Sequence, residues 1–460
     1  MTSALGISDN AVLLLAANLT SVPQLLGLRT LIAAYPDVLH FTAVLQILLK
    51  VLPETTSPED YVPIVYRSYR GRQQEPLSDD ISRIPTSFID EVASLSEQSL
   101  RRKLAAFNLD GGSASAEPDE KHLTEWFFDR ARRVEEATGM VDLARRLVLP
   151  DTTNLAQTPP FPPKAVTLWG KGIVQVLETF IFNNEDKDDL QLYSFEHLDA
   201  NSAVRLLLSR TTAETVSRDM QSLIVPFVEY VQYQESGKGT GVWETVWDWL
   251  LDRAMDAEMD FISNLAIDWK EGGREDILRD FLRTCLKACY ICPQSSPSIR
   301  TELHRIHAAV SQLSQQLDIP SAGQEIILRH PETDLLAHQL RSSSPLTDLT
   351  ESALRFLDQM ITSADIVSSL DVPLRQLVQV REGTEETQTD FVDQLIRGSD
   401  QNWTKRTEQQ WRHLKDSLNW LQSQSLVLGR LSVETLYTMV LTALLDATGT
   451  FSPYLLVRFC

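Results

Sequence analysis

The sequence has little of what several protein classes depend on. Only four of its 460 residues are cysteine, three of them bunched at Cys285, Cys289 and Cys292 and one at Cys460. This number and spacing do not make the disulfide framework of a small secreted domain. No run of about 20 apolar residues is present, so no membrane-spanning segment is predicted. The 18 glycines fall below the usual share of the residue, and strict apolar–polar alternation, the mark of half-buried strands, is hard to find.

Positive charge is also scarce. Lys and Arg total 42 against 63 Asp and Glu, which gives a formal net charge of −21. Such a surface repels polyanions, so nucleic-acid binding is excluded as the main function and anionic membranes are disfavoured. The apolar stretch from Ala11 to Ala17 is not preceded by a basic residue, the first being Arg29. It therefore lacks the positive region of a secretory signal, and a cytoplasmic protein is predicted.

The apolar residues that are present recur with the period of a helix. They make up 43% of the chain, close to the globular norm. Phe41, Leu45, Leu48 and Leu52 follow helical spacing, and the same spacing continues from residue 243 to residue 265. The sequence therefore predicts an all-α chain.

Helix boundaries are marked by capping residues and prolines. Ser8, Ser57 before Pro58 and Ser296 before a proline are typical helix starts. Short connections between helices favour antiparallel neighbours that bury their apolar faces against one another. The sequence has no fixed period, so it does not indicate one of the regular repeat families. We predict an irregular α-solenoid of stacked antiparallel helical hairpins. It forms one continuous array with segments 1–109, 119–235 and 241–460.

Motifs of catalytic chemistry are absent or incomplete. The chain contains no G-x-S-x-G, H-E-x-x-H or D-D-x-x-D pattern. Cys285, Cys289 and Cys292 have the spacing of radical iron–sulfur enzymes, but they continue a helical pattern, so buried structural cysteines are predicted. His304 and His307 would complete a zinc-like set whose H-x-x-H gap is shorter than usual. We predict no enzyme, no cofactor and no metal site, with an all-α metalloenzyme at this cluster as the alternative.

Five carboxylates recur at every fourth residue in the middle of the chain. On one helix such a row would wind through about 160° instead of converging on one metal ion. Neighbouring like charges are mildly unfavourable, so the row is predicted to be a solvated acidic ridge, with docking of a basic partner segment as the functional alternative. Its residues are Glu244, Asp248, Asp252, Asp256 and Asp260.

The N-terminal part contains a more specific pattern. Residues 49–63 read L-K-V-L-P-E-T-T-S-P-E-D-Y-V-P, after the apolar stretches 13–17 and 28–31. The pattern ends one helix at Pro53 and restarts the next at Pro58, with Tyr61 placed to pack on the preceding helix. It resembles the opening of the secretory-pathway Sec39 domain family, which includes NBAS-like proteins. The residues of this L-P-E-T element are Leu52, Pro53, Glu54, Thr55, Pro58 and Tyr61.

The resemblance implies an α-solenoid subunit of the Dsl (NRZ) tethering complex, peripheral on the cytosolic face of the endoplasmic reticulum. Such a subunit is a non-catalytic scaffold that binds a tether subunit and an ER SNARE for Golgi-to-ER transport, without inserting into the membrane. Family members are commonly longer, and the apolar end from Thr448 to Cys460 has no polar capping helix, so a truncated C-terminus is expected. A coat, nucleoporin or vacuolar-sorting subunit is the alternative scaffold.

Overall fold

The computed structural model describes residues 6–70, 84–109, 119–150, 161–182, 190–235, 240–269, 274–319, 344–398, 404 and 406–448. Within these residues, helices are the only regular secondary structure, which confirms the all-α prediction. The chain forms two compact units. Unit 1 comprises Met1–Leu207 and Met220–Val242, and unit 2 comprises Leu208–Asp219 and Trp243–Cys460. The predicted segments 1–109, 119–235 and 241–460 are not tested by this division and stay predictions.

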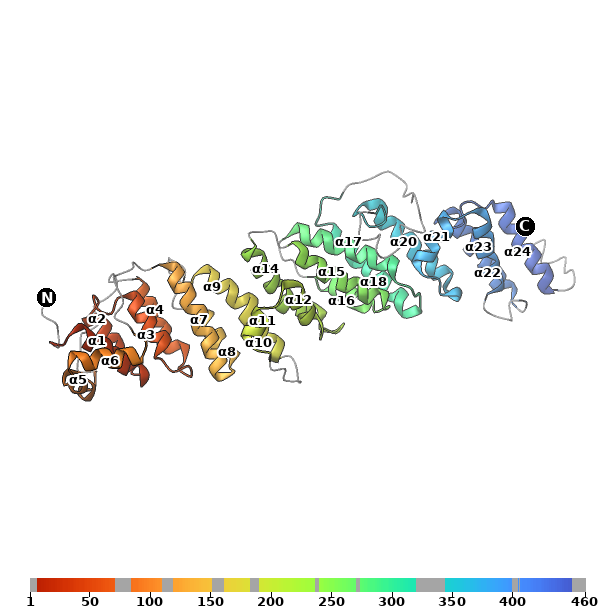
Figure 1. Ribbon diagram of the computed structural model, residues 1–460. Helices are drawn as coiled ribbons and strands as arrows, with labels where there is room; N and C mark the ends of the chain where they lie inside the picture. The colour runs from red at the N-terminus through yellow and green to blue at the C-terminus, as the bar shows by residue number, and fades with distance from the viewer. Residues whose placement is uncertain are drawn as a thin grey trace. The chain divides into compact units, whose positions relative to one another are not determined.

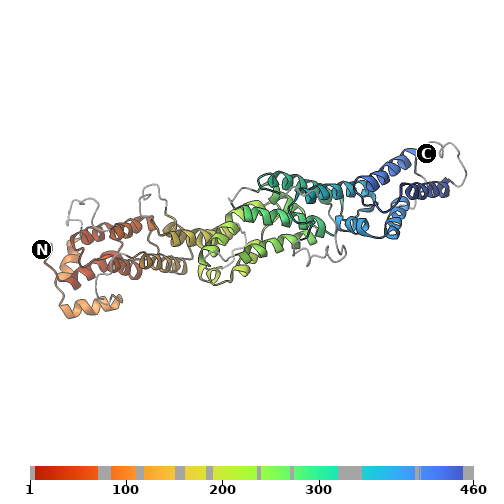
Figure 2. The same cartoon turned by 90° about the horizontal axis from the view of Figure 1, so that it is seen from above.

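In unit 1 the helices pack both on their neighbours in sequence and on helices several elements away (Figure 1 and Figure 2). Helix α1 packs on α2, α5 and α6, α3 packs on α4 and α7, and α7 forms a hairpin with α8. The bounds are α1 (Asp9–Ser21), α2 (Leu25–Ala34), α3 (Phe41–Lys50), α4 (Pro58–Arg70), α5 (Thr86–Ala93), α6 (Glu97–Ala106), α7 (Glu120–Thr138), α8 (Val141–Val148), α9 (Lys164–Trp169), η3 (Gly170–Val174), α10 (Gln175–Phe182), α11 (Leu192–Glu196), α12 (Ala200–Leu208), η4 (Met220–Ile224) and α14 (Val225–Gln234).

Unit 2 follows the same rule. Helix α16 packs on α17 and α18, α18 on α20, α20 on α21, and α24 on α22 and α23. Packing among helices that lie near one another in the chain is consistent with the predicted solenoid within each unit. The bounds are α13 (Val216–Asp219), α15 (Thr240–Met255), α16 (Asp260–Ile267), α17 (Glu275–Ile291), α18 (Pro297–Ser314), α20 (Glu351–Ile366), η5 (Ser368–Leu370), α21 (Leu374–Glu382), α22 (Glu385–Arg397), α23 (Glu408–Ser423) and α24 (Val433–Thr448).

The predicted capping residues start helices as expected. The Ser8 hydroxyl accepts the Ala11 N–H at 3.3 Å and begins α1. Ser296 accepts the Ile299 N–H at 3.4 Å, with Pro297 as the first residue of α18. Each cap supplies an acceptor for an N–H that has no partner inside the helix.

The helix that begins near Trp243 ends earlier than predicted. Helix α15 stops at Met255, and Ala257 has a φ of 63°, a left-handed conformation that cannot continue an α-helix. The Glu258 N–H donates to the Arg253 carbonyl at 2.9 Å and the Ala257 N–H to the Ala254 carbonyl at 3.1 Å. This pair of bonds is a Schellman motif, which is usually closed by glycine. Because alanine instead of glycine occupies this position, the helix end could not be recognised from the sequence.

A second correction concerns the prediction that the chain has no segment long and apolar enough to span a membrane. Helices α9, η3 and α10 join into one helix, Lys164–Phe182, which is long and apolar enough to cross a membrane by length and composition alone. Half of its most apolar stretch is buried inside the protein, as in a core helix. In its π-helical part, Gly172 lies against Tyr230 and the Pro226 carbonyl of α14. The helix is therefore part of the packing of unit 1.

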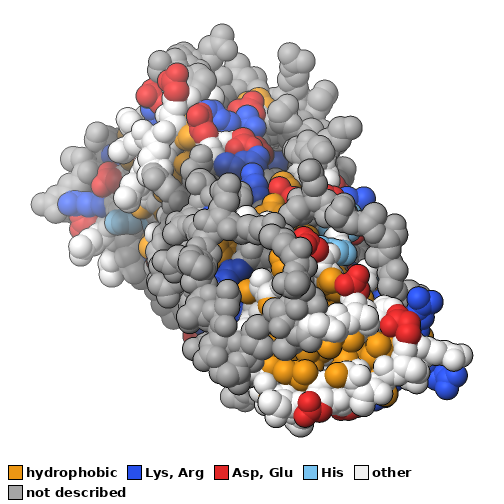
Figure 3. All heavy atoms as spheres, turned by 90° about the vertical axis from the view of Figure 1, so that its left-hand side faces the viewer, with side chains coloured by type: hydrophobic (Ala, Val, Ile, Leu, Met, Phe, Trp, Pro, Cys, Tyr) orange, Lys and Arg blue, Asp and Glu red, His pale blue; other side chains and the backbone are white. Residues whose placement is uncertain are grey.

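One end of unit 1 has hydrophobic side chains on its surface. The end that carries α1, α2, α5 and α6 shows a group of hydrophobic side chains in the space-filling view (Figure 3). Of the eight residues of α5, only Val92 is buried. In α1, by contrast, Leu14, Leu15 and Leu19 are fully buried, so α1 forms the core of this end.

Candidate functional site

The L-P-E-T element forms a tight turn between α3 and α4. Helix α3 ends at Lys50, and the Thr56 N–H donates to the Pro53 carbonyl at 3.1 Å, which closes the turn. Helix α4 then starts at Pro58, as the sequence predicts. The Pro53 carbonyl thus has one donor within the turn, whereas the Leu52 carbonyl needs a donor from elsewhere.

A single buried arginine supplies that donor and a second one to the Pro53 carbonyl. Arg130 of α7 donates from Nη1 to the Leu52 carbonyl at 2.9 Å and from Nη2 to the Pro53 carbonyl at 2.8 Å. Its Nη1 also lies 3.9 Å from Oε1 of Glu54, and the arginine side chain has no exposed surface. The planar guanidinium holds two neighbouring carbonyls at once, so α7 fixes the shape of the turn.

Aromatic rings of α4 and α7 pack beside the guanidinium. The ring of Tyr61 meets that of Trp126 edge-on, with centroids 6.3 Å apart, and the Arg130 Cζ lies 5.5 Å from the Tyr61 centroid. Trp126 donates from Nε1 to the Leu45 carbonyl of α3 at 2.9 Å. The ring of Tyr61 thus has two partners on α7, and its predicted packing on the preceding helix stays a prediction. Leu52 and Tyr61 are both buried, so the element is structural at its centre.

The outer rim of the element is held by an ion pair. Arg146 of α8 donates from Nε and Nη2 to the two carboxylate oxygens of Glu59, at 2.8 and 2.7 Å, and from Nη2 to the Ser57 hydroxyl at 2.9 Å. These bonds, led by the arginine donors, lower the pKa of Glu59 from 4.5 to about 2. Arg130 of α7 and Arg146 of α8 thus both bind the α3–α4 turn and join it to these two helices.

The Glu59 pair is expected to make stability depend on acid pH. Because the folded state holds the pKa of Glu59 near 2 against an unfolded value of 4.5, the unfolded chain binds the proton more readily. The contribution is complete above about pH 4.5 and disappears as the pH falls toward 2. Since the Glu59 side chain is 59% exposed, it should be about 1 kcal/mol or less.

The measurement is the difference in unfolding free energy between the wild type and E59Q at several pH values. The difference should shrink to zero toward pH 2. In an R146Q background, E59Q should leave the pH profile unchanged. A difference that stays constant with pH in the wild-type background would contradict the ion pair as its cause.

The acidic residues of the middle segment do not share one helix. Glu244, Asp248 and Asp252 lie on α15, Asp256 follows its end, and Asp260 begins α16. Asp256 lies 3.4 Å from Arg253, and the Asp260 carboxylate accepts the Phe261 N–H. Asp248 is half-buried. Burial lowers the pKa of Lys287, and the negative charge of Asp248 partly offsets this effect. The prediction that these carboxylates form one ridge along a single helix is therefore wrong. Docking of a basic partner segment at these residues stays a prediction.

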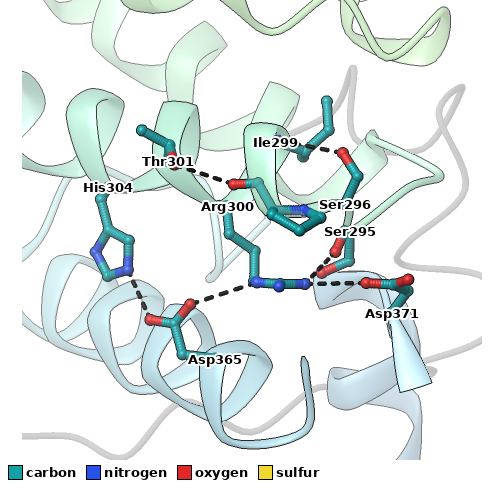
Figure 4. Close-up of polar contacts among 9 residues, drawn as sticks. Ser295, Ser296, Ile299, Arg300, Thr301, His304, Asp365 and Asp371 are labelled. Carbon is teal, nitrogen blue, oxygen red and sulfur yellow. Dashed lines mark hydrogen bonds and ion pairs between the residues drawn. The ribbon is translucent and has the colours of Figure 1, made fainter. Parts of the chain in front are cut away.

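The cysteine cluster lies in the interior of unit 2. Cys285 and Cys289 are on α17 and Cys292 follows its end; all three are buried, and burial raises the pKa of each thiol. His304 Nε2 lies 2.7 Å from the Asp365 carboxylate (Figure 4), and His307 lies 3.8 Å from Asp358. Over the described ranges, no group of three or more His, Cys, Asp or Glu residues is placed to hold a metal ion. Cys460 lies outside these ranges.

Burial of the three thiols has a chemical consequence. In a C460S variant, Cys285, Cys289 and Cys292 should react only slowly with a thiol reagent in the native protein, because the reactive thiolate is disfavoured. All three should react at once in guanidinium. Mass spectrometry of the labelled peptides checks this. Rapid labelling of any of the three in the native state would show that the thiol is accessible and ionised.

A comparison with protein-family models identifies the family of this chain. The family model described as secretory pathway protein Sec39 matches residues 13–454. The chain belongs to the Sec39 family. A search of the curated proteins found no match.

The Sec39 match extends far beyond the L-P-E-T element that carried the resemblance. It includes residues of both unit 1 and unit 2, and it contains Arg130 and Arg146 as well as the turn that they hold. Membership gives the chain a role in the secretory pathway. The sequence pattern missed Arg130, although its position next to Phe127, Ala131 and Val134 places it in the buried stripe of α7.

Proposed function

We propose that this Sec39-family chain is a non-catalytic scaffold subunit of a vesicle-tethering complex. It binds a tether subunit and an ER SNARE, lies peripherally on the cytosolic face of the endoplasmic reticulum, and serves Golgi-to-ER retrograde transport. The observation that carries the proposal is the family match over residues 13–454. The helical architecture supports it, because stacked helices present faces and grooves that bind other helices.

The design of the L-P-E-T turn suits a scaffold. Arg130 and Arg146 join the α3–α4 turn to α7 and α8 through side chains that bridge segments more than 70 residues apart in sequence. Such bridges fix the angle between successive hairpins, so that a partner-binding face on one hairpin keeps its position relative to the next.

The proposal is tested by affinity purification of the tagged chain from cells of its source, with quantitative mass spectrometry of the bound proteins. We expect tether subunits and an ER SNARE in amounts comparable to the bait, and absent with the tag alone. Recovery of coat, nuclear-pore or vacuolar-sorting subunits instead would reject the tethering role and favour another scaffold. Stoichiometric zinc or iron in the purified chain would reject the purely non-catalytic role.

A further inference from the structure

Among the described residues, three serines stand directly before a proline: Ser57, Ser296 and Ser344. This dipeptide is the substrate of proline-directed kinases, which bind it with an extended backbone. Proline favours that backbone, because it disfavours the helical conformation in the residue before it. The three serines therefore carry the same local signal, and only their surroundings can distinguish them. Thr158 and Ser452, which also precede prolines, lie outside the described residues.

Two of the three serines are held by the fold. Ser344 is 6% exposed, and its hydroxyl accepts the Leu346 N–H at 3.4 Å. The Ser57 hydroxyl donates to the Glu59 carboxylate and accepts a bond from Arg146 Nη2 at 2.9 Å. The proline that follows Ser57 is buried at the start of α4. A kinase must open the packing around either serine before it can bind the dipeptide.

Ser296 lies at the surface in an extended backbone. It ends the connection between α17 and α18, residues 292–296, which has no regular secondary structure. Ser296 itself is half-buried, with φ −62° and ψ 161°. The exposed residues on its two sides are Pro293, Gln294, Pro297 and Ser298. The dipeptide is thus presented in the conformation that a kinase binds.

The Ser296 hydroxyl contacts only its own turn. It accepts the Ile299 N–H at 3.4 Å (Figure 4) and lies 2.9 Å from the Ser298 hydroxyl. Among the described residues, no side chain of another helix binds it, whereas Arg146 of α8 binds the Ser57 hydroxyl. Freeing the Ser296 hydroxyl therefore breaks no contact between helices.

We propose that Ser296 is the phosphorylation site that the fold leaves open to a proline-directed kinase, with a nucleoside triphosphate as the phosphoryl donor. The Ser296 Oγ forms a bond to the γ-phosphorus, the bond from this phosphorus to the β,γ-bridging oxygen breaks, and the nucleoside diphosphate leaves. The hydroxyl proton passes to the catalytic carboxylate of the kinase. The inference goes beyond the proposed function and does not depend on it, because it rests on the surroundings of the dipeptide.

Phosphorylation changes the charge at the start of α18. A phosphate on Ser296 adds about 1.5 to 2 negative charges near pH 7. Arg300, one turn further along α18, lies 3.1 Å from Asp371 and 3.6 Å from Asp365, and Asp365 also lies 2.7 Å from His304 (Figure 4). Because two carboxylates already contact this arginine, the phosphate adds net negative charge to the surface.

The test compares the native chain with short peptides. The purified full chain is incubated with ATP and an active mitogen-activated protein kinase, a member of the proline-directed class, and mass spectrometry follows the phosphate at each serine with time. Synthetic peptides that contain each dipeptide with its own flanking residues give the reference rates. Ser296 in the native chain should react within about tenfold of its peptide. Ser57 and Ser344 should react about a hundredfold or more slower than theirs, because only a rare, locally unfolded state exposes them.

Two exposed prolines of the same connection supply a matched pair of variants. P297A removes the proline that follows the serine, whereas P293A removes one that follows a cysteine. P297A should strongly lower the rate at Ser296, and P293A should change it little. Both variants should keep the wild-type circular dichroism, because neither side chain belongs to the core.

Three results would overturn the proposal. These are no phosphate at Ser296 in the native chain, equal protection of the three serines relative to their peptides, or equal rates at Ser296 in P297A and P293A. None of these results bears on the tethering role, which depends on the proteins that co-purify with the chain.

Discussion

Replacing Arg130 by methionine should lower the free energy of unfolding by about 2 to 4 kcal/mol. Methionine keeps the apolar stem of the side chain but removes the donor to the buried Leu52 carbonyl and the second donor to the Pro53 carbonyl, which keeps the Thr56 N–H. A buried polar group that loses its partner costs about 1–3 kcal/mol. Because Arg130 has no exposed surface, water does not replace the lost donors without opening the packing of α4 on α7.

Chemical denaturation followed by circular dichroism measures the loss, and hydrogen exchange of peptides from α3, α4 and α7 locates it. R130K should fall between the wild type and R130M, because lysine keeps the charge but cannot hold two carbonyls in one plane. The control is R101A, whose side chain is 75% exposed on α6 and should change stability by about 0.5 kcal/mol or less. If R130M and R101A had equal effects, the turn would not depend on the buried guanidinium.

G172A should destabilise unit 1 by about 3 kcal/mol, at the upper end of the range for overpacked cores. A Cβ at Gly172 would overlap Tyr230 Cβ and lie 2.8 Å from the Pro226 carbonyl oxygen. Neither atom is the end of a flexible side chain, so α14 itself must move away from η3. The alanine would otherwise favour the helix, so a loss of stability identifies the close approach as its cause.

The matched control is G241A on α15, where an added Cβ meets nothing within 4 Å. It should leave stability unchanged or raise it by up to about 1 kcal/mol. Thermal unfolding of both variants, with hydrogen exchange of α14, distinguishes the two sites. A wild-type melting temperature for G172A would show that the helices separate easily at this crossing.

Local signals in the sequence located many elements correctly. Ser8 and Ser296 were recognisable as helix starts, because a capping hydroxyl acts within its own turn. The turn from Pro53 to Pro58 was recognisable for the same reason, since proline restricts the chain where it stands. The burial of Cys285 and Cys289 followed from helical spacing, which places residues i and i+4 on one face, whereas Cys292 is buried just past the helix end.

The errors arose where a local pattern has two outcomes. An alanine in the left-handed conformation ended α15, so that the row from Glu244 to Asp260 was broken between two helices. Residues 164–182 contain Lys164, Lys171 and Glu178, which concealed a helix of mixed but largely apolar composition.

The sequence by itself determined the helical class, the helix starts, the L-P-E-T turn and, through the family pattern, a role in the secretory pathway. These depend on interactions within one or two turns of chain or on a run of neighbouring residues. The tertiary structure alone decided that Arg130 holds the turn and that Gly172 must stay small. Each of these joins helices far apart in sequence, and the spacing of residues along a chain does not specify which helices will meet.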